Sequence, residues 1–205
     1  MRIDRVHARR ARDGVADRPS ERLLRSDSRT WAELGLVSGV VAVAAYAVAS
    51  AVPMSPALQA VAVSIFGPGI ALASAGLYEV LRLHRSTVGL KIGLVANIAA
   101  GITANGLQVG LDVAWDVFLA FGTFLLALNM WTHPRFGHVF AITGGVLAAL
   151  LLTLNLGTFP EPPPDGGLVD PGPLVGLWYL VAAIRIGSSL RWVDRNAAVS
   201  NSLTR

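Results

Sequence analysis

The chain has 205 residues, of which 53% are hydrophobic and only 15% are charged, and it contains no cysteine. This composition excludes an ordinary soluble domain, disulfide bonds and thiolate chemistry. The chain has 17 basic and 13 acidic residues, and their positions are more informative than their sum, because basic residues collect on the cytoplasmic side of membrane proteins.

Residues 1–30 are expected to form a basic cytoplasmic arm. This segment has nine arginines against five acidic residues, and Gly14 and Pro19 interrupt any long helix. We expect a solvated arm that touches anionic lipid headgroups, and a docking segment for a protein partner is the alternative. The arm lacks the interleaved aromatic residues of single-strand binders, so no nucleic-acid partner is expected.

The first two transmembrane spans are predicted at residues 31–52 and 57–81. Gly35 and Gly39 form a small-residue face on the first span, which allows close helix approach. The second span contains Gly67-Pro68-Gly69 near its middle. Proline removes a backbone donor and clashes with the preceding turn, so we predict a broken or kinked helix. Two interpretations stay open: a kink that serves packing, and a binding site of the kind that interrupted helices form in transporters.

The third span, residues 93–112, is apolar except for one polar seam. At roughly 100° per residue, the seam occupies about a third of the circumference. It consists of Gly93, Asn97, Gly101, Asn105, Gln108 and Asp112. An amide that faces lipid has no hydrogen-bond partner, so the seam must face other helices or water.

The seam has two possible roles. Its amides can tie neighbouring helices together, each hydrogen bond contributing on the order of 0.6 kcal/mol in a membrane. Alternatively, the seam lines a ligand pathway that is open toward Asp112 on the outside and closed by Glu79 and Arg185 on the inside.

Three further spans are predicted at residues 112–131, 136–156 and 174–190. Asp112 is a suitable N-cap for the fourth span, although it could instead bind a cation together with Asp116. Residues 158–173 contain six prolines and are expected to be extended. Trp178 and Tyr179 are placed near the outer part of the sixth span, and residues 191–205 are expected to form a short cytoplasmic tail.

The distribution of basic residues predicts the topology. The arm, the connection after the second span, the connection after the fourth span and the C-terminal end carry all 17 basic residues. The three remaining connections carry none. This alternation indicates six spans with both termini in the cytoplasm. The fold class is therefore an all-α polytopic membrane bundle, with its transmembrane domain at residues 31–190, and the expected location is the bacterial cytoplasmic membrane.

Arg185 lies inside the sixth span, where an isolated guanidinium is costly. We expect it to pair with Glu79 or Glu33, to extend its head toward the interface, or to take part in an anion or proton-coupling site. The four histidines map to the arm and the cytoplasmic connections, without the spacing of metal or haem ligands. No metal and no cofactor are expected.

Two stretches carry a resemblance to known sequences: AWDVFLAFG before WTHPRFGH, and FPEPPPDGGLVDPGPLVGLW. The layout resembles bacterial six-helix membrane families that are defined only as domains of unknown function. The resemblance implies the helical fold and the membrane location, and it implies no activity or catalytic residue.

The expected function is binding rather than catalysis. The main hypothesis is a small transporter or ligand-binding membrane protein that uses the seam and the Gly67-Pro68-Gly69 motif. The alternative is a non-catalytic subunit or assembly factor that binds proteins, or a second copy of itself, through helix faces and the basic arm. An enzyme is disfavoured, since no nucleophile and base occur at matching depth.

Overall fold

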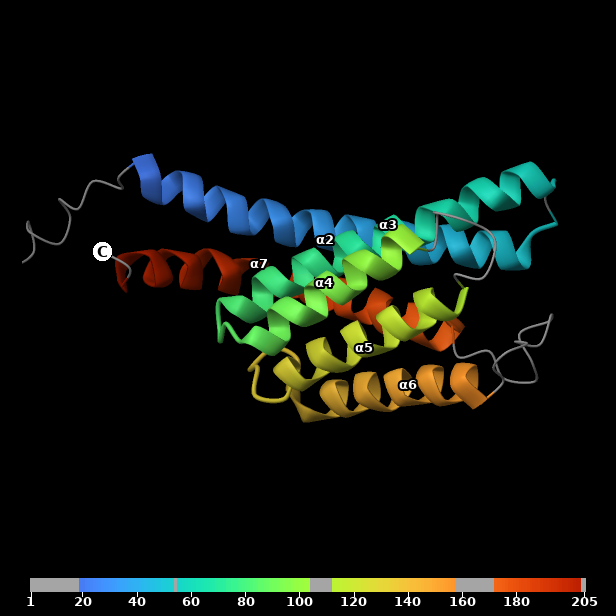
Figure 1. The fold of residues 1–205 in the computed structure, drawn as a ribbon. Coiled ribbons are helices and arrows are strands. Elements are labelled where there is room, and N and C mark those ends of the chain that lie inside the picture. Colours follow the sequence, from blue (N-terminus) through green and yellow to red (C-terminus); the bar gives the residue numbers. More distant parts are fainter. Residues whose placement is uncertain (1–18, 54, 104–111, 158–171, 204–205) are drawn as a thin grey trace, which may run out of the picture.

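The computed structural model describes residues 19–53, 55–103, 112–157 and 172–203, and these residues form six helices. The predicted all-α class is confirmed. The helices are α2 (Pro19–Ala51), α3 (Pro56–Arg82), α4 (Val88–Thr103), α5 (Asp112–Met130), α6 (Gly137–Gly157) and α7 (Gly172–Leu203). They lie in a bundle of roughly aligned and antiparallel helices (Figure 1).

Four helical stretches are long and apolar enough to cross a membrane. They are Asp27–Val48, Ser64–Arg82, Gly137–Leu154 and Pro173–Asn196, whereas the apolar parts of α4 and α5 are shorter, at Val88–Thr103 and Trp115–Met130. Large apolar side chains also point out of the bundle, with Val139 77% and Ile102 67% exposed. Such a surface needs an apolar surrounding, which indicates a membrane protein.

Side-chain caps define the beginnings of two helices. The Ser55 hydroxyl accepts from the Leu58 N–H at 3.4 Å, and Pro56 occupies the first turn of α3, where a missing N–H costs nothing. Before α4, the Thr87 hydroxyl accepts from the Leu90 N–H at 3.0 Å. The same hydroxyl donates to Asn129 Oδ1 at 2.7 Å, which joins the start of α4 to the end of α5.

The first and last helices are longer than predicted. α2 begins at Pro19 rather than near Trp31, and α7 continues past Leu190 to Leu203, so residues 191–203 extend the last helix. Proline is well tolerated at the first turn of a helix, and Pro19 therefore begins α2 instead of interrupting it. The N-terminal end of α2 and the C-terminal end of α7 lie at the same end of the bundle (Figure 1).

Small residues allow α2 to lie very close to α3 and α7. A Cβ atom on Gly35 would lie 2.6 Å from the Cα atom of Gly76 in α3. A Cβ atom on Gly39 would lie 2.8 Å from the Cβ atom of Ala183 in α7. The predicted close approach along Gly35 and Gly39 is confirmed, because any larger side chain there would displace a neighbouring helix.

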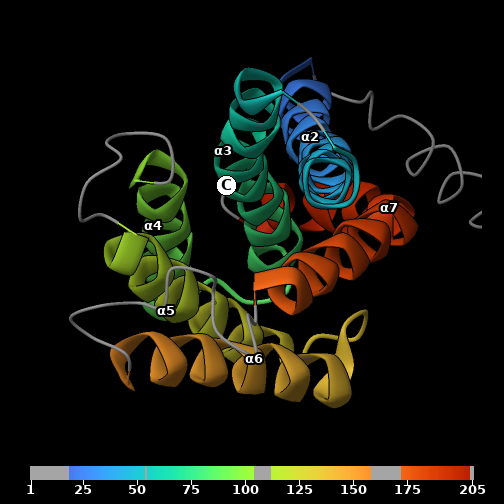
Figure 2. The ribbon, with the colours of Figure 1, turned by 90° about the vertical axis from the view of Figure 1, so that its right-hand side faces the viewer.

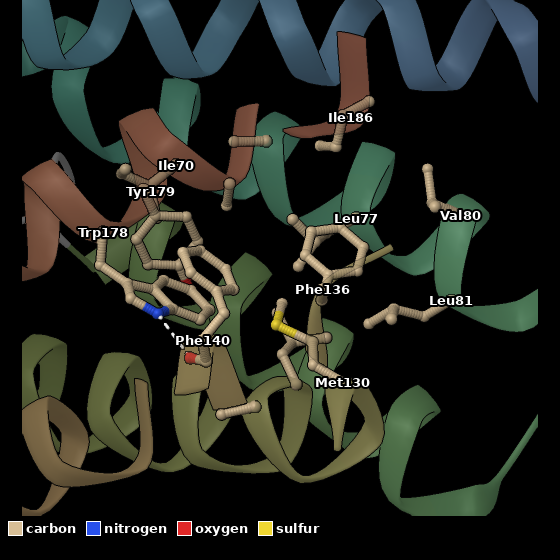
Figure 3. Close-up of a cluster of buried hydrophobic side chains, with 14 of the residues drawn as sticks. Ile70, Leu77, Val80, Leu81, Met130, Phe136, Phe140, Trp178, Tyr179 and Ile186 are labelled. Atoms are coloured by element: carbon tan, nitrogen blue, oxygen red, sulfur yellow. Dashed lines mark hydrogen bonds between the residues drawn. The ribbon is translucent and has the colours of Figure 1, made fainter. Parts of the chain in front are cut away.

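The apolar core lies where α3, α5, α6 and α7 meet (Figure 3). The Trp178 and Phe140 rings stack at 4.9 Å with an interplanar angle of 8°, and Trp178 Nε1 donates to the Phe140 carbonyl at 3.2 Å. α6 lies at the edge of the bundle and packs more extensively on α5 than on α7 (Figure 2). This loose contact leaves part of both α6 and α7 uncovered.

Candidate functional site

The Gly67-Pro68-Gly69 motif lies inside a helix that continues through it. α3 is helical from Pro56 to Arg82 with Pro68 in its interior, so an interrupted helix is not what the structure has. Gly67 and Gly69 are buried, whereas Pro68 is exposed. The two glycines therefore face neighbouring helices, and the proline ring points away from them.

Both glycines of this motif serve helix packing. A Cβ atom on Gly101 of α4 would lie 2.8 Å from the carbonyl oxygen of Gly67, and a Cβ atom on Gly69 would collide with Ala42 of α2. The motif thus places α3 against α4 on one side and α2 on the other. The seam residue Gly101 therefore lies in direct contact with the backbone of the α3 motif.

Asn97 of α4 is fully buried, which confirms that this part of the seam faces protein. Its Nδ2 donates to the hydroxyl of Tyr179 in α7 at 2.9 Å, and the Thr123 hydroxyl of α5 lies 2.9 Å from the same oxygen. We call Asn97, Thr123 and Tyr179 the polar node. Because its members come from three helices, the node ties α4, α5 and α7 together at the centre of the bundle.

Glycines make room for the amide of Asn97. A Cβ atom on Gly122 of α5 would collide with Asn97 Oδ1, and it would lie 2.9 Å from the Gly93 carbonyl oxygen. A Cβ atom on Gly93 would in turn lie 3.2 Å from the Gly122 carbonyl oxygen. The seam glycine Gly93 and Gly122 therefore allow α4 and α5 to approach closely on either side of the amide.

One atom of the node has no hydrogen-bond partner. Asn97 Oδ1 is buried and accepts no hydrogen bond from the described residues. A buried acceptor without a donor costs about 1–3 kcal/mol.

Ser74 of α3 is also fully buried, and its hydroxyl donates to the Ile70 carbonyl of its own helix at 2.8 Å.

The remaining seam residues lie outside what the structure describes. Asn105 and Gln108 fall within residues 104–111, and Asp112 begins α5 with a side chain that is not described. Asp112 does occupy the predicted start of the next helix. Whether the seam continues as a polar path toward Asp112 stays a prediction.

The predicted ion pair of Arg185 with Glu79 or Glu33 is not formed. Arg185 Nη1 donates to the Arg135 carbonyl oxygen in the turn between α5 and α6, at 2.9 Å, and its Cζ lies 5.8 Å from the centre of the Phe140 ring. The long side chain thus reaches the turn between the end of α5 and the start of α6. Whether this guanidinium lies at the membrane interface, as the alternative expectation has it, stays a prediction.

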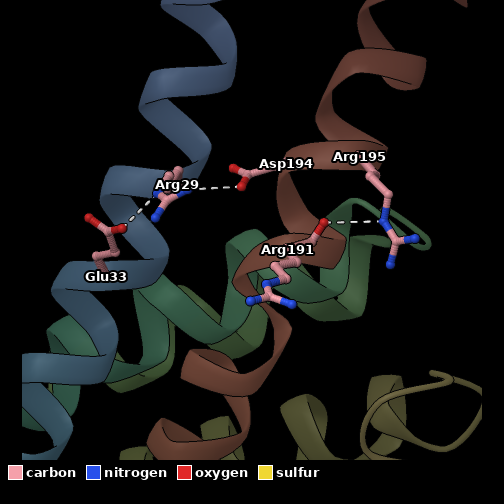
Figure 4. Close-up of polar contacts among 5 residues, drawn as sticks. All are labelled: Arg29, Glu33, Arg191, Asp194 and Arg195. Atoms are coloured by element: carbon pink, nitrogen blue, oxygen red, sulfur yellow. Dashed lines mark hydrogen bonds and ion pairs between the residues drawn. The ribbon is translucent and has the colours of Figure 1, made fainter.

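Both carboxylates pair with arginines of their own helices instead. Glu79 accepts from Arg82 Nε at 2.6 Å. Glu33 accepts from Arg29 Nε at 2.7 Å, and Arg29 also reaches Asp194 of α7 at 2.9 Å (Figure 4). Partners on the same helix are favoured over Arg185, because they are already adjacent and no distant chain segment has to be ordered. We call these five residues, together with Ser28, the charged end.

The charged end connects the three longest helices. Arg82 Nη2 lies 3.3 Å from the Ser28 hydroxyl, which joins α3 to α2, and the Arg29–Asp194 pair joins α2 to α7. Arg29 and Glu33 are about half exposed, with relative side-chain areas of 50% and 47%. Solvent-exposed pairs of this kind contribute little to stability individually, so their geometry mainly aligns the helix ends.

A histidine cluster beside the charged end was not predicted from the sequence. His133, in the turn between α5 and α6, is 1% exposed, and its ring lies 5.1 Å from His84 and 4.9 Å from Trp192. Its Nδ1 accepts from the Arg135 N–H at 3.2 Å, and its Nε2 has no hydrogen-bond partner among the described residues. His133 therefore packs as a neutral ring.

Burial lowers the pKa of His133 from 6.5 to about 4, and the charges of His84 and Arg135 lower it further, while the Val80 backbone opposes the shift. Within the described ranges, no three histidine, aspartate or glutamate side chains come together as metal ligands do. The arrangement at this end holds helices and loops in place, and its buried imidazole binds a proton only at a pH well below the ordinary pKa of histidine.

Sequence reasoning also missed two members of the polar node. The sequence predicts only the position of Tyr179 along its span, whereas the structure shows that Tyr179 is fully buried and accepts from Asn97. A signal was present, since Tyr179, Ala182, Ala183 and Ile186 form a buried stripe with helical spacing. Thr123 gave no such signal, because a threonine inside a helix usually bonds to its own backbone.

Comparisons with protein families, curated proteins and solved structures find no match to this chain.

Proposed function

We propose that this chain is a non-catalytic membrane protein that acts as a subunit or assembly factor by binding another protein at its charged end. The observation that carries the proposal is the joint extension of α2 and α7, joined by Arg29 and Asp194 at 2.9 Å. α7 alone has 32 residues, which at about 1.5 Å per residue is about 48 Å. A bilayer core is only about 30 Å thick. The N-terminal part of α2 (residues 19–29) and the C-terminal part of α7 (residues 191–203) therefore extend beyond it as a pair of helices, which we call the stalk.

The proposed topology has six spans with both termini in the cytoplasm of a bacterium. The turns after α3 and after α5 lie at the same end of the bundle as the stalk (Figure 1). These two turns and the stalk are also where the described arginines are concentrated. The positive-inside rule then assigns this end to the cytoplasm, which makes the stalk accessible to cytoplasmic proteins and anionic headgroups.

The expected partner has an acidic surface. Arg191 and Arg195 are exposed on the C-terminal part of α7 (Figure 4). Arg195 Nε donates to the Arg191 carbonyl at 3.3 Å, which holds that side chain along the helix. Repeated guanidinium groups on a rigid helix favour a carboxylate-rich partner.

The test is the mass of the complex extracted from native membranes in mild detergent, with and without charge reversal on the stalk. We expect the full chain to migrate with a partner, and Arg191→Glu with Arg195→Glu to release it. Arg85→Glu is the matched control, because Arg85 is an exposed arginine in the turn after α3 and not on the stalk. A wild-type chain that runs alone would contradict the proposal, and a multiple of its own mass would make a second copy the partner.

A small transporter or ligand-binding protein remains the second candidate, and the unpartnered Asn97 Oδ1 favours it. A polar acceptor that is buried at membrane depth is typical of substrate or ion sites, and a kink at Pro68 would give the adjacent α3 freedom to move. Asn105→Leu and Asp112→Asn should then remove ligand-dependent stabilisation while the protein still folds. Unchanged melting behaviour in both variants would reject this candidate.

A further inference from the structure

A groove of about 370 Å³ opens between α6 and α7. One wall is a stripe of side chains from Phe136, the residue before α6, to Leu147 on α6, and the other is a stripe from Leu174 to Arg185 on α7, at matching intervals. The intervals are three, one, three and four residues in both stripes, and this spacing keeps each stripe on one helix face. The groove is therefore straight and follows the helix axes.

The walls of the groove are apolar and uncovered. Val139 is 77%, Leu177 52% and Leu174 47% exposed. Thr143 lies at mid-groove, but its hydroxyl already donates to the Phe140 carbonyl of its own helix at 3.0 Å. The body of the groove thus offers no free donor, and it fits a hydrocarbon chain.

One end of the groove carries a positive charge. Arg185 lines it there and uses Nη1 for the Arg135 carbonyl. A guanidinium has five N–H donors, so most of its donors remain available. No ion pair among the described residues includes Arg185 or Arg135, and this end of the groove therefore attracts an anion.

The length of the groove fits one leaflet. From Leu174 to Arg185 the helix advances by eleven residues, which is about 16 Å at about 1.5 Å per residue. Half of a hydrocarbon core of about 30 Å is about 15 Å. An acyl chain that fills the groove from Leu174 would thus place its headgroup beside Arg185.

We propose that the groove between α6 and α7 is a binding site for an anionic phospholipid, with one acyl chain along the groove and the phosphate on Arg185. A second cavity supplies the internal comparison. It has about 290 Å³, lies between α5 and α6, and is lined by residues such as Phe124, Leu128 and Ile142, without a charged one. That cavity can hold a chain but has no means to select an anionic headgroup.

The experiment measures lipid binding to the full chain in detergent by native mass spectrometry. Dioleoylphosphatidylglycerol and dioleoylphosphatidylcholine are titrated in parallel, since they share acyl chains and differ in net charge. We expect the wild type to prefer the anionic lipid by about tenfold, the effect of a hydrogen bond to a charged group. Arg185→Gln should lose this preference, and Arg185→Lys should retain most of it.

Two matched controls separate the headgroup from the chain. Arg85→Gln removes an exposed arginine in the turn after α3 that does not line the groove, and it should leave the preference intact. Val139→Trp should fill the groove and weaken both lipids, whereas Ile142→Trp fills the second cavity and should leave the anionic preference unchanged. All four positions are exposed, so these changes leave the core intact.

Several outcomes would overturn the proposal. They are equal binding of the two lipids by the wild type, a preference that survives Arg185→Gln, and a loss that Arg85→Gln reproduces. Displacement of the lipid by inorganic phosphate alone would show a simple anion site. Binding that Val139→Trp leaves unchanged would show that the chain lies elsewhere.

Discussion

The polar node and the charged end both join α7 to other helices, but with different chemistry: the node joins it to α4 and α5, and the charged end joins it to α2. In the node, Asn97, Thr123 and Tyr179 are neutral, fully buried and surrounded by apolar side chains. At the charged end, Arg29 and Glu33 form ion pairs that are half exposed. Neutral hydrogen bonds occupy the depth at which a charge would be costly, and ion pairs occupy the depth at which water solvates them.

This difference indicates where the helix arrangement is rigid. Around the node, the glycines at positions 93 and 122 leave no free space beside Asn97. At the charged end, long side chains bridge helix ends and can adjust their rotamers. We therefore expect substitutions in the node to affect folding, and substitutions at the charged end to affect mainly the orientation of the stalk.

The largest effect is expected from Gly122→Val, which would place a side chain against Asn97 Oδ1. Overpacking of this kind costs about 1–3 kcal/mol or more, and it should lower the midpoint of unfolding in a detergent titration. Gly145→Val is the control, because a Cβ atom there meets only Phe124, at 4.0 Å. Equal losses in both variants would show that the node is not tightly packed.

The next effect is confined to acidic pH and belongs to His133. Its pKa is about 4 in the folded chain, against 6.5 for the ordinary imidazole. Between these values the unfolded state binds a proton that the folded state does not, so stability falls as the pH drops from 6.5 to about 4. Below that range this loss stops growing.

The variant His133→Asn tests this effect, because it keeps an acceptor for the Arg135 N–H and removes the titration. Melting temperatures from neutral pH to pH 4 should decline less steeply in the variant than in the wild type. Parallel curves would mean that the imidazole is not buried as a neutral ring, and the charged end would then be more open than it is in the structure.

A smaller loss is expected from Tyr179→Phe, which removes the hydrogen bonds to Asn97 and Thr123 and little volume. At on the order of 0.6 kcal/mol per bond in a membrane, the loss should be about 1 kcal/mol. A double-mutant cycle with Asn97→Leu isolates the bond between them. If the losses in unfolding free energy of the two variants are fully additive, Asn97 and Tyr179 do not stabilise the fold cooperatively.

The smallest effect should come from Arg29→Gln. Half-exposed ion pairs contribute about 0–1 kcal/mol, and added salt should reduce the difference from the wild type. Chemical unfolding at low and high salt measures this difference in the free energy of unfolding. A loss as large as that of Gly122→Val would reverse the contrast between the two regions.

Much of the fold could be predicted because the relevant signals are local. Apolar length, the small-residue face of Gly35 and Gly39 and the inward orientation of Asn97 depend only on helix periodicity and on the cost of exposing an amide to lipid. The span limits predicted at Trp31 and Leu190 are not the ends of α2 and α7, since hydropathy indicates where a helix is apolar and not where the helix stops.

Partners could not be predicted in the same way. The sequence by itself determined that Asn97 needs a hydrogen-bond partner inside the protein and that the Arg185 guanidinium needs a polar partner or water. Only the tertiary structure decided that the partner of Asn97 is Tyr179, 82 positions away, and that Arg185 reaches a loop carbonyl instead of Glu79. The reason is physical: periodicity orients a side chain within its own helix, whereas the neighbour it meets depends on how the helices are arranged around it.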